Sequence, residues 1–339
     1  MITYSIHTVM LTTGLSYDQL CRLGHLKEIH GVYENQKVRK YPHGQGGITR
    51  FEIAPYWDKT TNKIMGSSFR IIINPSFTAD ARLISPKEIR SSFKRIFQRI
   101  SEIVPRDIVE NLKISRIDFT GDLQMTTQEQ ADEYIALMKK GRQIRSLEEK
   151  VYYNIVQQDW KSYDESWYLG CRSYDLQVYP KYHQMKNHGL SGAENALGIV
   201  RFELRCGRQK IKSIAKKYGI NMDISIKDVL TCFAFAAPEP EITNIIKASV
   251  GAGDFYTLAE LKRLIELSPN QVRTKEKMLN LVQMIARYDS VQDLIDRGLL
   301  EASEWRFLLE KFDAIGISPI PIPARFKYET AIGVLEWWI

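Results

Sequence analysis

Alternating apolar and polar positions predict strands in the first two thirds of the chain. In IVRFELRC (199–206) every second residue is apolar, and the residues between them are Arg201, Glu203 and Arg205. Such alternation places the two sets on opposite faces of a strand. Comparable runs predict strands at 2–11, 48–56, 68–74, 114–123, 151–156, 166–171 and 174–179.

Apolar residues at helical spacing predict helices elsewhere. In residues 86–101, Ser85 is a candidate cap, Pro86 suits the first turn, and Arg90 and Lys94 lie on a basic face opposite the apolar stripe. A second helix is expected at 126–141. Helical patterns then dominate, at 208–220, 226–237, 257–267, 275–288, 291–299 and 303–317.

The order of these elements predicts an α+β fold. We expect residues 1–220 to form an antiparallel sheet with flanking helices, and residues 221–339 to form an all-α C-terminal domain. Such a division is compatible with a chain of 339 residues.

Composition narrows the functional classes. The net charge of +7 is consistent with a polyanionic partner. The four cysteines are scattered, without the close spacing of a zinc site. The N-terminal residues do not read as a signal peptide, and no apolar run reaches the ~18 residues of a membrane span. We therefore expect an intracellular protein with no membrane partner.

One short motif, arginine–apolar–acid, occurs in three predicted strands, at residues 50–52, 116–118 and 201–203. The acids of the three motifs are Glu52, Asp118 and Glu203, and Asp122 follows the second motif. A carboxylate on a central strand needs a partner, and pairing with the nearby arginines is one explanation. The other is a site for one Mg²⁺ or Mn²⁺ ion, which prefers oxygen ligands. The residues alone leave both open.

A tyrosine cluster in LQVYPKYHQ supplies candidate covalent chemistry. Tyr179 ends a predicted strand, followed by Lys181 and Tyr182. A phenol is a weak nucleophile because its unperturbed pKa is about 10, but a metal ion and a lysine ammonium both favour the phenolate. Packing is the alternative role, since the chain has 17 tyrosines.

Three blocks, in this order, resemble the replication initiators of filamentous phages, the gene II family. They are ISRIDFTGDLQMTTQEQADEYIALMKKG, LQVYPKYHQ and GIVRFELRCGRQKIKSIAKKYGI. More distantly, the blocks resemble the rolling-circle Rep proteins of small Gram-positive plasmids. The segment EWRFLLEKFDAIGIS is similar to the end of the family's C-terminal domain.

The resemblance implies an enzyme that nicks the plus strand of supercoiled origin DNA and becomes joined to its 5′ phosphate. It later cleaves and recircularises the displaced single strand. Tyr179 corresponds to the nucleophile and Lys181 to its neighbouring base-type residue, and Tyr182 either assists or substitutes for Tyr179. Asp118 and Glu203 correspond to metal ligands. The resemblance also implies a host helicase and replication machinery as partners, in the bacterial cytoplasm.

The chain departs from the family pattern in the segment FRIIINPSF. Phage relatives have an acid and a lysine there, where this chain has Arg70 and the pair Asn74-Pro75. The plasmid branch uses Asn-Pro, so Asn74 is a candidate site residue. From the place of Glu52 in the repeated arginine–apolar–acid motif, we infer that it replaces the acid of the phage relatives. No His-hydrophobe-His motif is present, which leaves the third metal ligand open.

Basic side chains on the predicted elements are candidates for DNA contact. Lysine and arginine neutralise backbone phosphates, and the basic helix 86–101 and the segment 205–217 are the main cationic stretches. The candidates are Arg90, Lys94, Arg116, Arg201, Arg205 and Lys212.

The sequence leaves alternative functions open. The same chemistry would serve a plasmid replication initiator. A DNA-binding regulator of a mobile element, without enzymatic activity, would need the carboxylates only as partners of the arginines. A ribonucleoprotein component, in which the aromatic segment WKSYDESWY (160–168) stacks on RNA, is a third possibility.

Overall fold

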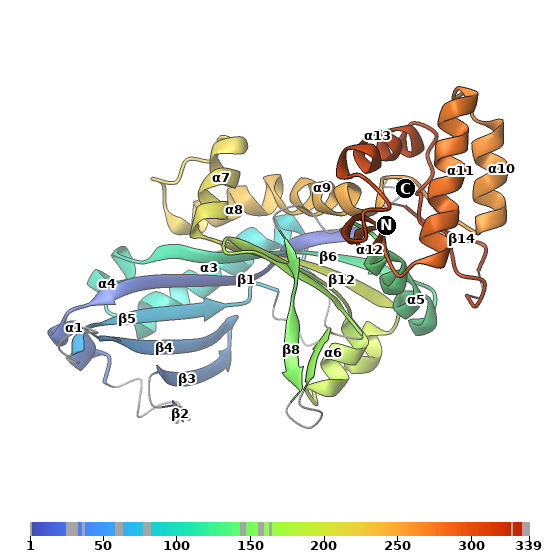
Figure 1. The fold of residues 1–339 in the computed structure, drawn as a ribbon. Coiled ribbons are helices and arrows are strands. Elements are labelled where there is room, and N and C mark those ends of the chain that lie inside the picture. The colour runs from blue at the N-terminus through green and yellow to red at the C-terminus, as the bar shows by residue number, and fades with distance from the viewer. Residues whose placement is uncertain are drawn as a thin grey trace. The chain divides into compact units, whose positions relative to one another are not determined.

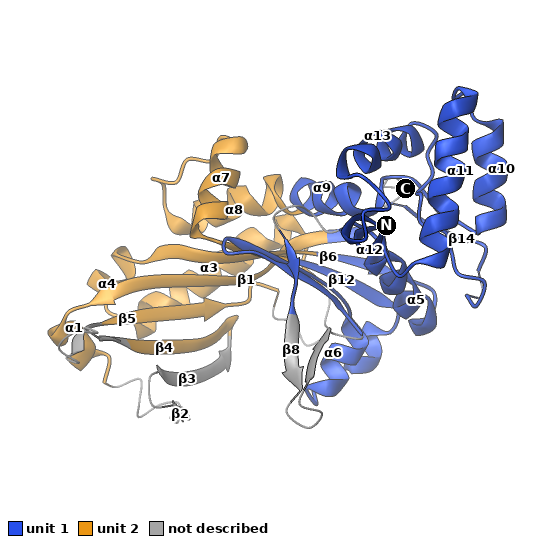
Figure 2. Cartoon of the chain, in the orientation of Figure 1, with its two compact units in different colours: residues 1–3, 121–203, 239–339 blue, residues 4–120, 204–238 orange. Residues whose placement is uncertain are grey.

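The computed structural model describes residues 2–24, 33–35, 38–57, 64–76, 83–142, 147–154, 159–162, 165–326 and 328–333 (Figure 1). These residues form two compact units, coloured separately in Figure 2. Unit 1 comprises residues 1–3, 121–203 and 239–339, and unit 2 comprises residues 4–120 and 204–238. Strands β6 (Lys113–Gln124) and β12 (Ile199–Gly207) contribute residues to both units.

Unit 2 is built on antiparallel strands. Their hydrogen-bonded order is β2 (Tyr33–Asn35), β3 (Val38–Gln45), β4 (Ile48–Trp57), β5 (Ile64–Ile73), β1 (Ile2–Leu15), then the first part of β6 and the last part of β12. Alternation holds over part of β1: Val9 and Leu11 are fully buried and Met10 between them is partly exposed, whereas the consecutive residues Ser5 and Ile6 are both buried. Phe51 of β4 stacks on Phe69 of β5, with ring centroids 5.8 Å apart. Aromatic neighbours of this kind hold two strands in register.

Helices complete unit 2. Helix α3 (Pro86–Ile103) begins as the sequence predicts: the Ser85 hydroxyl accepts the backbone N–H of Glu88, and the Glu88 side chain accepts the backbone N–H of Ser85. Its expected apolar stripe is buried, and it contacts α8 (Ile226–Ala236). The other helices of unit 2 are α1 (Tyr17–Arg22), α4 (Arg106–Glu110) and α7 (Arg208–Lys217).

Unit 1 contains the end of β6 and the start of β12, followed by β11 (Tyr174–Pro180), β10 (Trp167–Gly170) and β7 (Glu148–Glu149). In the antiparallel β10–β11 pair, Trp167 lies opposite Val178. Helix α5 (Gln128–Lys139) contacts β10 and β11. Helix α6 (Lys181–Asn187), which the sequence analysis does not predict, follows β11 directly, and η1 (Ala193–Ala196) precedes β12. Strands β8 (Val151–Asn154) and β9 (Asp159–Ser162) form a separate pair.

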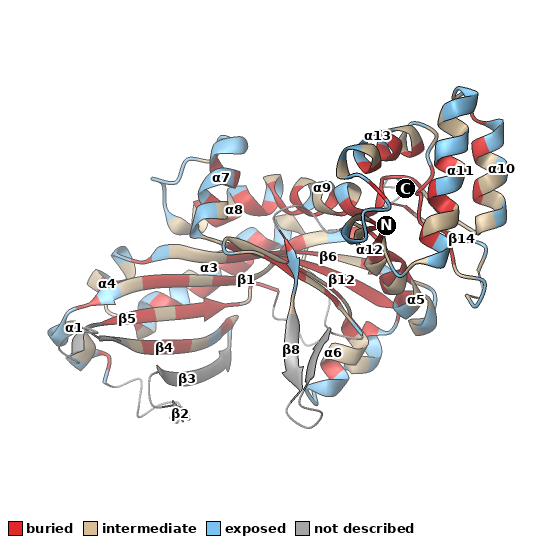
Figure 3. Cartoon of the chain, viewed as in Figure 1, coloured by how far each residue is buried: buried red, intermediate tan, exposed pale blue. Residues whose placement is uncertain are grey.

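The C-terminal part of unit 1 is helical. Its helices are α9 (Pro238–Val250), α10 (Leu258–Leu267), α11 (Val272–Arg287), α12 (Val291–Asp296) and α13 (Ala302–Asp313). The two-residue strands β13 (Phe255–Tyr256) and β14 (Thr330–Ala331) pair beside them. Large apolar side chains of this part, including Trp305 and Phe312, are almost fully buried (Figure 3). The sequence analysis does not predict α9, because its start, PEPE, reads as a loop.

The fold class agrees with the prediction, an antiparallel sheet with helices and a helical C-terminal part. The two units are interleaved along the chain and neither ends at residue 220, so the predicted division into 1–220 and 221–339 stays a prediction. Among the described residues, no helix is both long and apolar enough to cross a membrane.

Candidate active site

The end of strand β11 positions the predicted nucleophile. Pro180 has no N–H to donate to a ladder, so it suits the last position of the strand. Helix α6 begins at the next residue, Lys181. Tyr179 is therefore the last residue before the proline, and Lys181 lies in the first turn of the helix. The sequence pattern predicts Tyr179 at a strand end, and the structure places it there.

Tyr179 is hydrogen-bonded to a predicted site carboxylate. Its phenol Oη donates to Oε2 of Glu203 at 2.9 Å. Glu203 lies on β12, the neighbour of β11, and is only 7% exposed. Burial, followed by the negative charge of Glu203, raises the pKa of Tyr179 well above its ordinary value. The phenol is thus protonated at neutral pH, with a carboxylate in place to accept its proton.

Arg201 and Asp122 form a buried ion pair in the same unit. The guanidinium donates from Nε to Oδ1 and from Nη2 to Oδ2, both at 2.6 Å. Arg201 is 1% exposed. This bidentate geometry joins β12 to β6 and is the strong form of an arginine–carboxylate contact. The arginine of the third arginine–apolar–acid motif therefore pairs with the aspartate of the neighbouring strand.

Lys181, two residues after Tyr179, is the second buried cation of this part of unit 1. It is 7% exposed, and its ammonium Nζ donates to Oε1 of Gln184 at 2.8 Å. Burial and then the positive charge of Arg201 lower the pKa of Lys181 to about 8. Lys181 is therefore a cation at neutral pH that loses its proton in mildly alkaline solution. We name Tyr179, Lys181, Arg201, Glu203 and Asp122 the tyrosine cluster; all five belong to unit 1.

The substitution Asp122→Asn is expected to destabilise the protein by roughly 3–5 kcal/mol, because it leaves a buried guanidinium without its carboxylate. The midpoint of urea unfolding measures the change. Glu304→Gln is the matched control, since Glu304 pairs with Lys277 at the surface of the same unit, with side chains 35% and 47% exposed. We expect this control to change stability by less than about 1 kcal/mol. Equal effects of the two substitutions would contradict the structural role of the Arg201–Asp122 pair.

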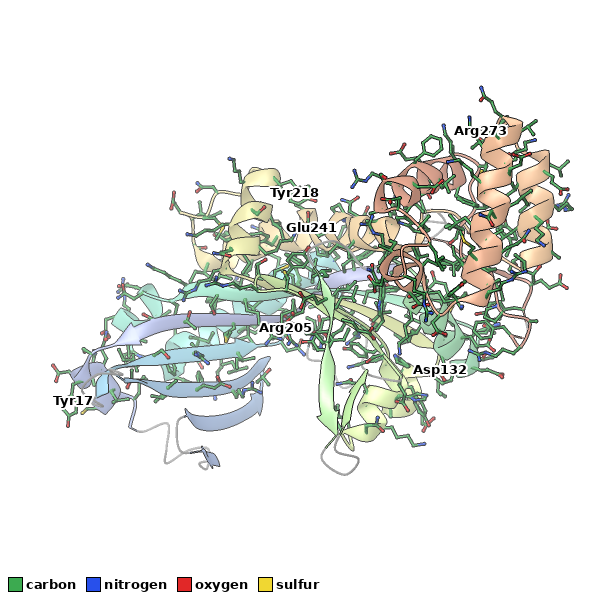
Figure 4. All side chains as sticks on the ribbon, viewed as in Figure 1. Tyr17, Asp132, Arg205, Tyr218, Glu241 and Arg273 are labelled. Atoms are coloured by element: carbon green, nitrogen blue, oxygen red, sulfur yellow. The ribbon has the colours of Figure 1, made fainter. Side chains whose placement is uncertain are left out.

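The other two predicted carboxylates lie in unit 2, and each is hydrogen-bonded to the arginine of its own motif. Asp118 is fully buried; Nε of Arg116 donates to its Oδ1 at 2.6 Å, and Nη2 of Arg116 to its Oδ2. Nε of Arg205, labelled in Figure 4, lies 3.9 Å from Oδ2 of Asp118. In β4, Nε of Arg50 donates to Oε1 of Glu52 at 2.7 Å.

The remaining predicted DNA contacts are also placed in unit 2. Arg90 and Lys94 on α3, and Lys212 on α7, are exposed. Asn74 has a local role: its Oδ1 accepts the backbone N–H of Ser76 at 3.0 Å, an Asx turn after β5. Its amide Nδ2 lies 3.4 Å from Nε2 of His7. Their contact with DNA stays a prediction, as does that of Arg116, Arg201 and Arg205.

The residues of the tyrosine cluster fit a hard divalent cation. Asp122 and Glu203 both influence the pKa values of Tyr179 and Lys181; in the structure Asp122 accepts hydrogen bonds from Arg201, and Glu203 accepts one from Tyr179. Mg²⁺ is commonly held by one or two carboxylates, with water and a substrate phosphate as the other ligands. Within the described ranges, no group of three or more His, Cys, Asp or Glu residues forms a protein-only cage. The donors thus suit Mg²⁺ or Mn²⁺ and exclude a zinc-type set in this cluster.

The helix after Tyr179 contains features that the sequence analysis does not find. Tyr182 lies on α6, where Nζ of Lys186 is 5.4 Å from the centre of its ring and 3.4 Å from its hydroxyl. His183 lies between two acids, with Nε2 3.5 Å from Asp132 (Figure 4) and Nδ1 3.3 Å from Glu165. Because these acids come from distant positions, spacing along the chain offers no signal for the contacts.

The chain was compared with families, curated proteins and solved structures. No family model matches it, and no curated protein matches it. Among solved structures it is similar to the rolling circle replication initiator protein from Geobacillus stearothermophilus, with a TM-score of 0.29 and 14% sequence identity. The alignment covers 64% of this chain and 78% of that one. At so weak a similarity, the function of this chain has to be argued from its own residues.

Proposed function

We propose that this protein is a DNA nicking and joining enzyme that initiates rolling-circle replication, with Tyr179 as its nucleophile. The observation that carries the proposal is the hydrogen bond from the Tyr179 phenol to Glu203, with two almost fully buried cations, Arg201 and Lys181, in the same unit. A nucleophile, a base within 2.9 Å and positive charge for a phosphate are the parts required for phosphoryl transfer by a side chain.

The nicking step follows from this geometry. Tyr179 Oη attacks the scissile phosphorus while its proton passes to Glu203, and the bond from phosphorus to the 3′ oxygen breaks. The departing oxygen takes up a proton and becomes the 3′-OH that primes synthesis. The 5′ phosphate remains on Tyr179 as a phosphotyrosine ester. Since one phosphoester replaces another, a 3′-OH can attack the ester and close the strand without ATP.

Positive charge stabilises the transition state, in which the phosphate oxygens carry additional negative charge. Lys181, beside Tyr179, is the cation that we assign to contact these oxygens. Arg201 adds to the local positive potential while it orients Asp122 through two hydrogen bonds. Because both side chains are almost fully buried, their interaction with a bound phosphate is weakly screened by water.

Asp122 and Glu203 are the residues that would hold Mg²⁺ or Mn²⁺ in this cluster. When bound, such an ion polarises the scissile phosphate and favours ionisation of a nearby hydroxyl. Asp118 and Glu52, in unit 2, stay sequence-based candidates for further ligands.

Supercoiled origin DNA and the displaced single strand are the substrates in this proposal. A host helicase and the replication machinery are the expected partners, in a bacterial cytoplasm. A phage or a plasmid replicon would use the same chemistry.

A DNA-binding regulator is the second candidate function. It is favoured by one observation: Glu52, Asp118 and Asp122 each form a close ion pair with an arginine. Paired carboxylates of this kind need no metal ion to account for them.

Formation of a covalent adduct distinguishes the two functions. The protein is incubated with supercoiled DNA of its parent replicon and Mg²⁺ or Mn²⁺, and then denatured with detergent. The proposal expects nicked circles and a protein–DNA species that survives denaturation, with both lost in the presence of a chelator. Tight binding without a nick under any metal would favour the regulator.

The nicking rate is expected to decrease as the pH rises through about 8. The pKa of Lys181 is lowered to about 8, so its ammonium is present below that pH and is lost above it. In Lys181→Arg the charge persists through this range, and the decrease should move to higher pH. Rate profiles of the two proteins between pH 6 and pH 10 test this. The same alkaline limb in both would show that Lys181 does not supply the charge.

A further inference from the structure

Unit 2 contains a groove that is separate from the tyrosine cluster. Its volume is about 730 Å³. It is formed by β1, β5, the start of β6 and the first residue of α7, with contributions from α1 and the turn before β6. The lining residues are Met10, Thr12, Thr13, Gly14, Gln19, Ser68, Arg70, Asn111, Lys113, Ser115 and Arg208.

The lining of this groove is cationic. Arg70, Lys113 and Arg208 contribute positive charge, and none of the lining residues is acidic or aromatic. The Arg70 side chain is 38% exposed and forms an ion pair with Glu52, which lies 3.6 Å away and outside the lining. Hydroxyl and amide side chains make up most of the rest. This is the set of side chains that contacts phosphate and sugar in nucleic-acid complexes.

The register of the strands builds this surface. In the antiparallel pair of β1 and β5, Thr12 lies opposite Arg70 and Gly14 opposite Ser68, so all four face one side. A Cβ built on Gly14 would meet nothing within 4 Å, so the surface is open at this position. Arg208 reaches the same side from α7, where its Nη2 donates to Oγ1 of Thr12 at 2.8 Å.

The size of the groove decides which form of nucleic acid it suits. Its volume lies within the ~300–1,000 Å³ of pockets that enclose small ligands, enough for a few nucleotides of one strand. Because no lining residue is aromatic, bases have no stacking platform here, and the three cations are placed to bind backbone phosphates.

We propose that the groove around Arg70, Lys113 and Arg208 binds the phosphodiester backbone of a single DNA strand, without reading its bases. The choice of DNA as the polyanion rests on the proposed function, whereas the site and its backbone chemistry rest on the groove itself. Such a site would retain a strand whatever its sequence, as an enzyme must that holds a displaced strand through a whole round of synthesis.

Binding of labelled single-stranded oligonucleotides of several sequences to the full chain tests this, by anisotropy over a range of salt concentrations. Arg70→Gln, Lys113→Gln and Arg208→Gln should each lower the affinity at 50 mM salt by roughly 3- to 10-fold, equally for all sequences. Each should also reduce the slope of log K against log salt by about 0.7, the value for one single-strand phosphate contact. Arg208→Lys keeps the charge and should retain the slope.

The matched control is Arg273→Gln, an exposed arginine on α11 of unit 1 (Figure 4) that loses the same charge. Affinities and slopes of the three groove variants equal to those of this control would overturn the proposal. It would also be overturned if only duplex binding were weakened, or if the loss depended on base sequence. Thermal unfolding of each variant confirms that it is folded.

The test separates this inference from the proposed function. Tyr179→Phe lies in unit 1 and should leave the single-strand salt slope unchanged. A slope that responds to the groove variants, in a protein that forms no covalent adduct, would support the groove and contradict the nicking enzyme. An adduct that forms normally at saturating DNA, with slopes unaffected by the groove variants, would do the reverse.

Discussion

Tyr179→Phe is expected to abolish the covalent protein–DNA adduct. The substitution removes only the phenol oxygen, the atom that attacks phosphorus, and retains the ring. Binding of DNA should change little, because the basic side chains remain. The measurement is the adduct that survives detergent after incubation with supercoiled DNA and Mg²⁺. Loss of the phenol leaves Glu203 without one hydrogen-bond donor, which costs roughly 1–3 kcal/mol, so thermal unfolding is recorded in parallel.

Tyr182→Phe is the matched control for that experiment. Tyr182 lies on α6, where its ring and hydroxyl contact Lys186. We expect this variant to form the adduct at a rate close to that of the unsubstituted protein. An adduct that persists in Tyr179→Phe and disappears in Tyr182→Phe would retain the function and move the nucleophile to the helix.

Glu203→Gln is expected to slow nicking by about 10²–10⁴-fold, the usual contribution of a general base. The amide has the size of the carboxylate but cannot accept the phenol proton and become neutral. Since the pKa of Tyr179 is raised well above its ordinary value, spontaneous ionisation at neutral pH does not replace the base. Single-turnover nicking, measured at saturating Mg²⁺ and DNA, reports the rate of the chemical step.

The pH dependence distinguishes loss of a base from loss of a metal ligand. Without a base, the residual rate of Glu203→Gln should rise with pH up to about 8, because phenolate becomes more abundant, and level off above that pH, where Lys181 loses its charge. If Glu203 acted only as a ligand, higher metal concentrations would restore the rate. Glu304→Gln, with its acid at a surface ion pair, is the control and should nick normally. A rate for Glu203→Gln within a few-fold of this control would contradict the assignment.

Much of the secondary structure is predictable from local patterns. Apolar alternation marks β12, and the sequence around Ser85 marks the start of α3, because burial of one face and satisfaction of end groups are decided by near neighbours. Helix α9 escapes prediction because prolines at its start resemble a loop. Helix α6 escapes because it is a short helix directly after a strand.

The candidate site was only partly predictable. The sequence identifies Tyr179, Lys181 and Glu203 as candidates through the blocks that resemble a known family. It presents arginine–apolar–acid, however, as one repeated motif. In the structure the arginine of this motif pairs with a carboxylate in two different ways. The arginine pairs with the acid two residues on in Arg50–Glu52, whereas Arg201 pairs with Asp122 of the neighbouring strand.

The sequence by itself determined strands β1, β4, β5, β6, β8, β10, β11 and β12, most helices and the class of fold, and it offered the candidate nucleophile, since these depend on residues close together in the chain. Only the tertiary structure decided that the Tyr179 phenol faces Glu203, that Lys181 is buried beside a second cation, and that three basic side chains line one groove. The physical reason is the register between strands. A shift of one residue turns every side chain to the opposite face, and no local pattern specifies which distant residues then meet.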